Sequence, residues 1–458
     1  MKSEMDFTRG PILGPLLRFT LPMLLALCLQ AMYGAVDLWV VGWFGSAADV
    51  SAVSIGSQLM QTITSVVTGL AMGATILLGQ HLGEGRRQEA GEVVGSAIAL
   101  FGVLALVLTA ALPLGAQSLA RLMQTPHEAL AGTCIYLDIC AGGEVFIVAY
   151  NVLGSIFRGI GDSRTPLFAV SIACACNIVG DIVLVGPCHM GVAGAALATV
   201  LSQGISVVLC GLAMRRHRLP FVLGKNELRP RRRVAAKVLR LGAPVALEDL
   251  LVSISFLALL AIVNSLGLIA SAGVGVAERL CSFIMLVPSS FMQSLSAFVA
   301  QNAGARQPVR ARRAMLYGMA VSFSLGVVMA ALAFFKGDML AAIFAPNDPE
   351  VVAAAADYLR AYAIDTLLVS FLFCFVGYFN GHGKTGFVLI QGLLGAFGVR
   401  IPISWWVSRR PGVTLFHVGL ATPCSTMVQI VLCTALYLRL RKKNSGAPPC
   451  PQDTSFSA

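Results

Sequence analysis

The stretch "GQHLGEGRRQEA", residues 79–90, returns in altered form as "AQNAGARQPVRA" at residues 300–311. The match pairs Gln80 with Gln301 and Gly83 with Gly304. Three more segment pairs repeat at the same spacing of 221 or 222 residues: "LLRFTLP" (16–22) with "VLRLGAP" (238–244), "YL" at 136 with "YL" at 358, and "FRGIGDSRTP" (157–166) with "FNGHGKTGFV" (379–388). The sequence therefore predicts two copies of one unit.

The composition is typical of a polytopic membrane protein. Of 458 residues, 57% are hydrophobic and 12% charged, and the mean hydropathy is +0.80, whereas soluble domains carry about 25% charged residues. A membrane-spanning helix needs about 20 apolar residues. Twelve runs qualify: 16–44, 53–80, 93–115, 131–154, 166–187, 190–214, 243–266, 274–300, 314–336, 354–379, 386–407 and 415–438. We expect no cleavable signal peptide before the first run. We predict an all-α integral membrane protein with twelve transmembrane helices in two pseudo-symmetric six-helix lobes.

The basic residues predict the orientation. Most of the 33 Lys and Arg residues fall on one set of alternating loops, while the opposite loops carry only Arg121, Lys336, Arg409 and Arg410. The positive-inside rule then places both termini in the cytoplasm of a multi-pass protein of the bacterial inner membrane. The net charge of +11 is thus no sign of nucleic-acid binding. We expect four regions: an N-lobe (1–214), a basic cytoplasmic linker (215–242), a C-lobe (243–443) and a disordered cytoplasmic tail (444–458).

Cysteine and histidine give no sign of a metal or catalytic site. Nearly all of the twelve cysteines lie inside apolar runs, where cysteine behaves as a small hydrophobe. The six histidines lie in loops or near helix ends, without catalytic or metal-ligand spacing. We therefore expect a transporter rather than an enzyme, a lipid bilayer as its surroundings, no cofactor beyond a coupling ion, and a monomer.

Polar residues within the spans mark a candidate ion site. Asp37 in the first span, Asp181 in the fifth and Thr199 in the sixth should all lie about 10 Å below the outer surface, at about 1.5 Å per residue. Asn177 shares a helical face with Asp181. Such oxygens suit a small cation such as Na⁺, or a proton shared by two carboxylates. The alternative is that each aspartate only bonds a neighbouring helix.

The second half does not repeat these residues at the constant spacing. Asp37 aligns with Leu259, Asn177 with Val399 and Asp181 with Ile403, so we expect coupling in the N-terminal half alone. Other polar and helix-breaking residues have weaker assignments. They are Asp365, a possible second proton or drug contact; Glu248, which we expect at the solvated start of the seventh helix; and Pro22, a static kink or a gating hinge in the first helix.

Over residues 10–440 the sequence resembles the multidrug and toxic compound extrusion (MATE) family, in particular its bacterial branch that groups with DNA-damage-inducible proteins. The resemblance rests on several segments together: "LPMLLALCLQAMYGAVDLWVVGWFG", "GLAMGATILLGQHLGEG", "NVLGSIFRGIGDSRTPL", "NIVGDIVLVG", "GVAGAALATVLSQ" and "SAFVAQNAGARQPVRA". It implies a two-lobed exporter that expels cationic, amphipathic compounds in exchange for Na⁺ or H⁺.

The resemblance also implies residue roles. The family's N-lobe coupling residues match Asp37, Asn177, Asp181 and Thr199, its helix-1 proline matches Pro22, and its lobe-facing tyrosine matches Tyr136. One departure is local: relatives often have Leu-Asp-Pro where this chain has Gly180-Asp181-Ile182.

The sequence thus predicts a cation-coupled multidrug antiporter, without deciding between Na⁺ and H⁺. The alternative on a similar fold is a flippase for a lipid-linked or amphipathic metabolite, which would need a basic central cavity. The charged residues predicted at membrane depth are mostly acidic, which argues against an anionic substrate.

Overall fold

The computed structural model describes residues 6–216, 219–221, 224 and 226–445, and this part of the chain is helical without strands. The first half holds α1 (Leu13–Phe44), α2 (Ala47–Gly83), α3 (Arg87–Leu122), α4 (His127–Gly142), α5 (Glu144–Ile160), α6 (Arg164–Val185) and α7 (Gly191–Arg216). The second half holds α8 (Arg232–Asn264), α9 (Leu268–Ile284), α10 (Leu286–Gly304), α11 (Pro308–Phe335), α12 (Gly337–Ala342), α13 (Pro349–Gly381), α14 (Thr385–Leu393), the π-helix η1 (Leu394–Arg400), α15 (Ile401–Ser408), α16 (Leu415–Gly419) and α17 (Ala421–Ser445).

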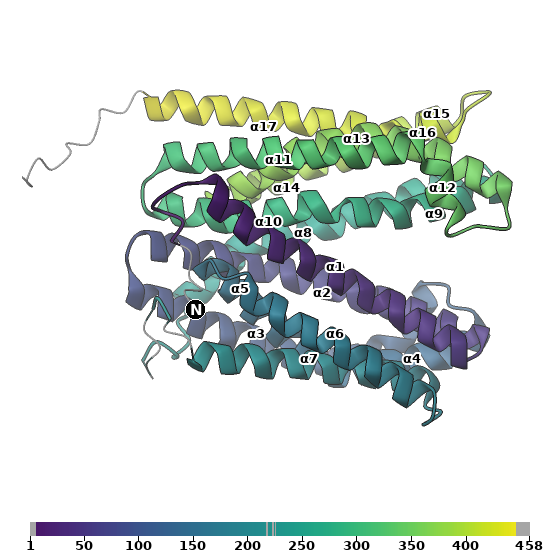
Figure 1. The fold of residues 1–458 in the computed structure, drawn as a ribbon, viewed down its shortest axis with the longest axis horizontal. Helices are drawn as coiled ribbons and strands as arrows, with labels where there is room; N and C mark the ends of the chain where they lie inside the picture. The colour runs from purple at the N-terminus through teal and green to yellow at the C-terminus, as the bar shows by residue number, and fades with distance from the viewer. Residues whose placement is uncertain (1–5, 217–218, 222–223, 225, 446–458) are drawn as a thin grey trace, which may run out of the picture.

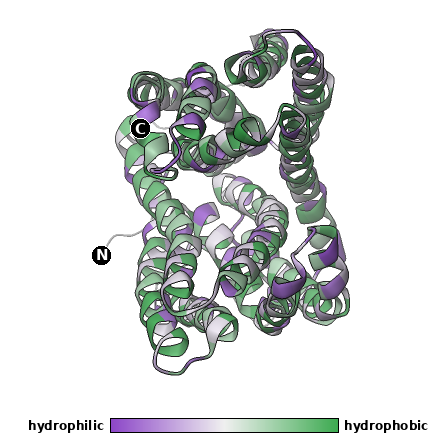
Figure 2. Cartoon of the chain, turned by 90° about the vertical axis from the view of Figure 1, so that its right-hand side faces the viewer, coloured by the Kyte–Doolittle hydropathy of each residue, from purple (hydrophilic) through white to green (hydrophobic). Residues whose placement is uncertain are grey.

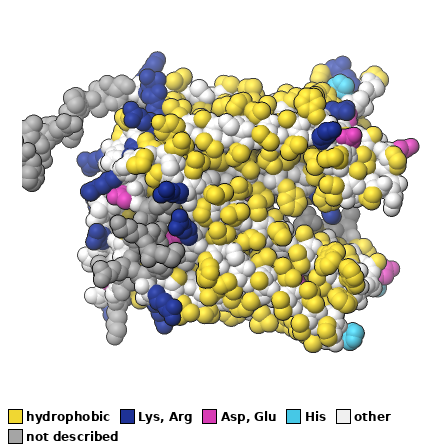
Figure 3. All heavy atoms as spheres, viewed as in Figure 1, with side chains coloured by type: hydrophobic (Ala, Val, Ile, Leu, Met, Phe, Trp, Pro, Cys, Tyr) yellow, Lys and Arg dark blue, Asp and Glu magenta, His cyan; other side chains and the backbone are white. Residues whose placement is uncertain are grey.

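These helices form the predicted two-lobed membrane protein. In the described residues eleven spans are long and apolar enough to cross a membrane, and the bent pair α4–α5 makes a twelfth. The two halves of the chain lie as separate layers of helices (Figure 1), and the end-on view shows them as two bundles (Figure 2). On the face shown in Figure 3, hydrophobic side chains cover the middle of the molecule, and a dense group of Lys and Arg lies at the end where α1 begins and α17 ends. We call this the basic end.

Three local features differ from the predicted spans. The fourth span, expected at 131–154, bends by 56° where α4 meets α5 at Gly143. The eleventh contains a seven-residue π-helix. The eighth helix element, α8, begins at Arg232, so the last part of the expected linker 215–242 is helical. The expected tail lies outside the described residues except for Asn444 and Ser445, which end α17.

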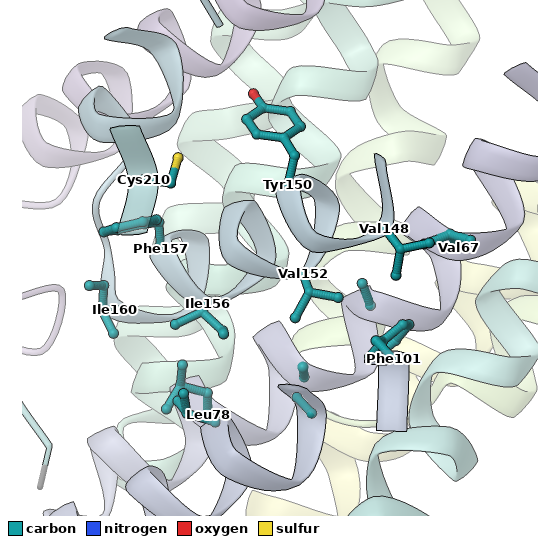
Figure 4. Close-up of a cluster of buried hydrophobic side chains, with 14 of the residues drawn as sticks. Val67, Leu78, Phe101, Val148, Tyr150, Val152, Ile156, Phe157, Ile160 and Cys210 are labelled. Atoms are coloured by element: carbon teal, nitrogen blue, oxygen red, sulfur yellow. The ribbon is translucent and has the colours of Figure 1, made fainter. Parts of the chain in front are cut away.

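The N-lobe core is built from large apolar side chains of α2, α3 and α5. Val67, Phe101, Ile156 and Phe157 belong to one buried cluster (Figure 4). Because lipid tails are as apolar as these side chains, close packing rather than removal from water stabilises such a cluster in a bilayer.

The start of α1 is built into the other lobe. Phe7 is fully buried among C-lobe side chains, with its ring 4.8 Å from that of Phe298. Arg310 of α11 holds this segment by donating hydrogen bonds to the carbonyl oxygens of Phe7 at 2.7 Å, Gly10 at 2.6 Å and Arg9 at 2.8 Å. The first helix therefore joins the two lobes physically.

Glycines allow the lobes to meet closely near the basic end. A Cβ atom added at Gly73 of α2 would collide with the backbone of Val238 and Gly242 of α8. A Cβ at Gly83 would collide with Gln301 of α10. Small residues permit such close approach of helices in membranes.

Two reciprocal hydrogen bonds join the lobes at the same end. Gln80 Nε2 donates to the carbonyl oxygen of Gly381 at 3.0 Å, and Gln301 Nε2 donates to that of Gly159 at 2.9 Å. The two donors are the residues paired by the internal repeat, and so are the two acceptors. The lobes therefore meet through a pseudo-two-fold contact in which each copy gives and receives one hydrogen bond.

Replacing both Gln80 and Gln301 with alanine should lower the thermal unfolding midpoint of the purified protein. Each substitution leaves a buried carbonyl without its donor, which costs about 1–3 kcal/mol. The control Gln58→Ala removes an exposed side chain from the same helix, α2, and should leave the midpoint unchanged. Equal midpoints for the double variant and the wild type would contradict a stabilising role for the two hydrogen bonds.

Candidate functional site

The four polar residues predicted within the N-lobe spans come together. Asp37 of α1 is 3% exposed, and Asn177 and Asp181 of α6 are fully buried. Thr199 of α7 donates a hydrogen bond from Oγ1 to Asp37 Oδ2 at 3.2 Å. Asp37 also interacts with the side chains of both Asn177 and Asp181. We call these four residues the N-lobe polar set.

Most polar atoms of the N-lobe polar set have no hydrogen-bond partner in the described residues. Asp37 Oδ1, both carboxylate oxygens of Asp181 and both polar atoms of the Asn177 amide are buried without a hydrogen bond in the described residues. Buried polar groups in proteins are normally paired. Four of these five atoms are oxygens, the ligand type that hard cations prefer. The set therefore fits a small cation or a proton held between two carboxylates.

Tyr136, which the resemblance matched to a lobe-facing tyrosine, lies beside this set. It is buried on α4, and its side chain interacts with Thr199 and Asp37. Its ring packs against Gly56 of α2, where a Cβ atom would collide with it. The tyrosine therefore forms a wall of the site on the α4 side.

Pro22 lies where α1 passes from one lobe to the other. Its neighbour Met23 belongs to the C-lobe core cluster, whereas Ala26, one turn later, belongs to the N-lobe cluster. A proline at this point leaves one carbonyl of the helix without its amide partner. A bend here would move the segment that carries Asp37 relative to the C-lobe.

The expectation for Glu248 was wrong. Because α8 begins at Arg232, Glu248 lies near the middle of a 33-residue helix and not at its solvated start. It is half-buried, and its Oε1 accepts a hydrogen bond from Gln391 Nε2 of α14 at 3.2 Å. Asp365 is buried on α13, and its Oδ1 accepts a hydrogen bond from Thr426 Oγ1 at 2.6 Å. Both acids lie in the C-lobe and outside the N-lobe polar set.

The π-helix changes which residues of the two repeats correspond. Up to Ala396, inside the π-helix, buried positions of the eleventh span match those of α6 at a spacing of 222, as Gln391 matches Ala169 and Ala396 matches Cys174. From the last residue of the π-helix onward, the buried positions are Arg400 and Ser404. The wider turn of a π-helix shifts the following side chains by one position. The burial pattern therefore pairs Asn177 with Arg400 and Asp181 with Ser404, in place of the expected Val399 and Ile403.

Two buried charges were missed by the sequence-based site prediction. Arg400 ends the π-helix and is 5% exposed. Glu144 begins α5 at the bend of the fourth span; it is fully buried, and neither carboxylate oxygen has a partner in the described residues. An ionisable residue within an apolar run was the available signal for both.

Comparison with known proteins identifies the family. The MatE family model matches this chain twice, over residues 22–183 and again over residues 244–406. The chain belongs to the MatE family. The two matches begin 222 residues apart and end 223 apart, in agreement with the one-residue shift at the π-helix. This MatE protein is a transporter and not an enzyme, as predicted.

Similar proteins extend over nearly the whole chain. A probable multidrug resistance protein of Bacillus subtilis, YpnP, is 28% identical over 417 residues, 91% of each chain. An FAD transporter of Shewanella oneidensis is 25% identical, covering 96% of this chain and 97% of its own. A crystal structure of MATE in complex with MaL6 superposes with a TM-score of 0.89 at 21% identity, covering 97% of this chain and 99% of that one. The structural match confirms the fold.

Thr199→Val should reduce export at least tenfold. Valine keeps the shape of the side chain but removes the hydrogen bond to Asp37, and a hydrogen bond to a charged group contributes about 1.5–3 kcal/mol. Thr199→Ser keeps the hydroxyl and should retain most of the activity. Rates of dye efflux from cells that express each variant at equal levels measure the effect. Equal rates for the valine and serine variants would show that the hydroxyl has no role.

Proposed function

We propose that this MatE protein is a cation-coupled antiporter that exports cationic, amphipathic compounds by alternating access of its two lobes. The observation that supports this most directly is the N-lobe polar set, which gathers two carboxylates, an amide and a hydroxyl from α1, α6 and α7 inside one lobe. An ionisable residue at membrane depth marks an ion or substrate pathway by default.

Charge neutralisation is the proposed basis of coupling. Two adjacent carboxylates buried away from water repel each other and lose hydration, so a proton or Na⁺ shared by Asp37 and Asp181 would stabilise the set. The site then alternates between a loaded state and an unloaded state with different net charge. Since Asp37 lies on the helix that joins the lobes, we propose that loading changes α1 at Pro22 and with it the relative position of the lobes.

The proposed substrate class rests on charge and on similarity. Within the predicted spans, the buried acids of the described residues are Asp37, Glu144, Asp181 and Asp365, whereas the buried cation is Arg400. This excess of acids favours cationic substrates, as does the similarity to a probable multidrug resistance protein. A flippase for an anionic, lipid-linked metabolite has less support from these charges.

The remaining assignments follow from the sequence. We propose that the basic end faces the cytoplasm, since the positive-inside rule places Lys-rich and Arg-rich loops there. Both termini would then be cytoplasmic, in the inner membrane of a bacterium. We further propose that the transporter acts as a monomer, with the two lobes of one chain providing the whole pathway.

Asp37→Asn and Asp181→Asn should each reduce transport at least tenfold. Asparagine keeps the size of the side chain but cannot exchange a proton or supply a full charge to Na⁺. The assay is ethidium transport in proteoliposomes, with a Na⁺ gradient and a pH gradient imposed separately on the wild type and each variant. The gradient that drives the wild type identifies the coupling ion.

Asp138→Asn is the matched control, because Asp138 is exposed on the neighbouring helix α4. It should transport ethidium at the wild-type rate. Wild-type rates for both the Asp37 and Asp181 variants would overturn the proposal, as would wild-type transport that neither gradient drives.

A further inference from the structure

The C-lobe contains a counterpart of the N-lobe polar set with a different charge. The burial pattern pairs Arg400 with Asn177 and Ser404 with Asp181 across the two repeats. The tripeptide "LAT" ends at Thr199 in the first half and at Thr422 in the second, at the same spacing of 223. Ser404 is fully buried and Thr422 is 1% exposed. These three C-lobe positions thus carry a guanidinium and two hydroxyls, with no carboxylate.

Arg400 is held firmly within the lobe. Its Nη1 donates a hydrogen bond to Ser255 Oγ of α8 at 2.9 Å. The guanidinium lies over the ring of Phe256, with Cζ 4.2 Å from the ring centre. A desolvated cation over an aromatic face is stabilised by the negative potential of the ring face. The side chain is therefore fixed in the interior and does not extend to the membrane surface.

Two acids of the C-lobe lie near Arg400. Asp365 and Glu278 both interact electrostatically with Arg400. Within the described residues, no Lys or Arg, Arg400 included, forms an ion pair with either carboxylate, so Arg400 acts on them at longer range. Glu278 Oε1 is buried without a partner. The other titratable groups near Asp365 are uncharged in their ordinary state: Cys281 of α9, and Tyr358 and Tyr362 of α13.

We infer that Arg400 is a tethered cation, which supplies to the C-lobe permanently the positive charge that the N-lobe obtains from its coupling ion. This inference rests on the proposed coupling role of the N-lobe polar set. Buried charges need an opposite charge nearby, and removing one partner of a buried pair is strongly destabilising. With Arg400 in place, Asp365 needs no ion from solution. One lobe then carries the coupling ion, and the other supports the same architecture with a fixed charge.

The test removes the tethered charge in a protein that lacks the N-lobe site. In an Asp37→Asn, Asp181→Asn background, we expect Arg400→Gln to lower the thermal unfolding midpoint in N-methylglucamine buffer at pH 8. Addition of NaCl at matched ionic strength, or a change to pH 5.5, should then raise the midpoint of this variant. The same changes should leave the midpoint of the background protein with Arg400 unaltered, because Arg400 already balances the charge of Asp365.

Two further variants keep the test decisive. Arg400→Lys retains the charge and should stay independent of Na⁺ and pH. Adding Asp365→Asn to Arg400→Gln removes the unbalanced acid and should recover the midpoint without any cation, including where Arg400→Gln alone fails to fold.

An Arg400→Gln protein with an unchanged, cation-independent midpoint would overturn the inference, and so would a failure of Asp365→Asn to recover a destabilised one. Because these readouts are thermal, they are independent of the transport assay. If the Asp37 and Asp181 variants transport normally, the proposed coupling site fails while the charge balance of the C-lobe is still tested.

Discussion

The hydrocarbon interior of a membrane offers no water to polar groups, so each must find its partner within the protein. This constraint explains why Asp37, Asn177, Asp181 and Thr199 converge from three helices of one lobe. It also explains why Arg400, in the C-lobe, is paired with a hydroxyl and an aromatic ring and lies near acids of its own lobe. In this chain, polar residues inside the bundle are therefore more informative about function than the many apolar residues around them.

The two lobes are symmetric in the contact between them and asymmetric in the polar residues inside each lobe. At the basic end, Gln80 and Gln301 form matching hydrogen bonds to the opposite lobe. Farther along, one π-helix turns Arg400 and Ser404 into the positions that Asn177 and Asp181 occupy in the first repeat. A single-residue shift thus gave one copy of a duplicated unit a different electrostatic character without altering the interface between the copies.

Much of the fold and of the N-lobe site could be predicted from the sequence. The twelve spans follow from hydropathy alone, and Asp37 and Asp181 stand out because charge is costly in an apolar run. Glu248 was misplaced because the start of α8 is too basic to be recognised as part of a membrane-spanning helix. The correspondence of Arg400 with Asn177 was missed because repeats aligned at a constant spacing cannot reveal a local change of helical period.

The sequence by itself determined the membrane environment, the two repeats and the identity of the polar residues within the spans, since each depends on composition and on order along the chain. Only the tertiary structure decided which of those residues face one another. Whether two side chains meet depends on the rotation of each helix about its axis and on the contacts between helices. The close approach at Gly73 and the one-residue shift in the π-helix that ends at Arg400 are examples. Packing fixes these quantities, because residues far apart in the chain supply the two sides of every contact.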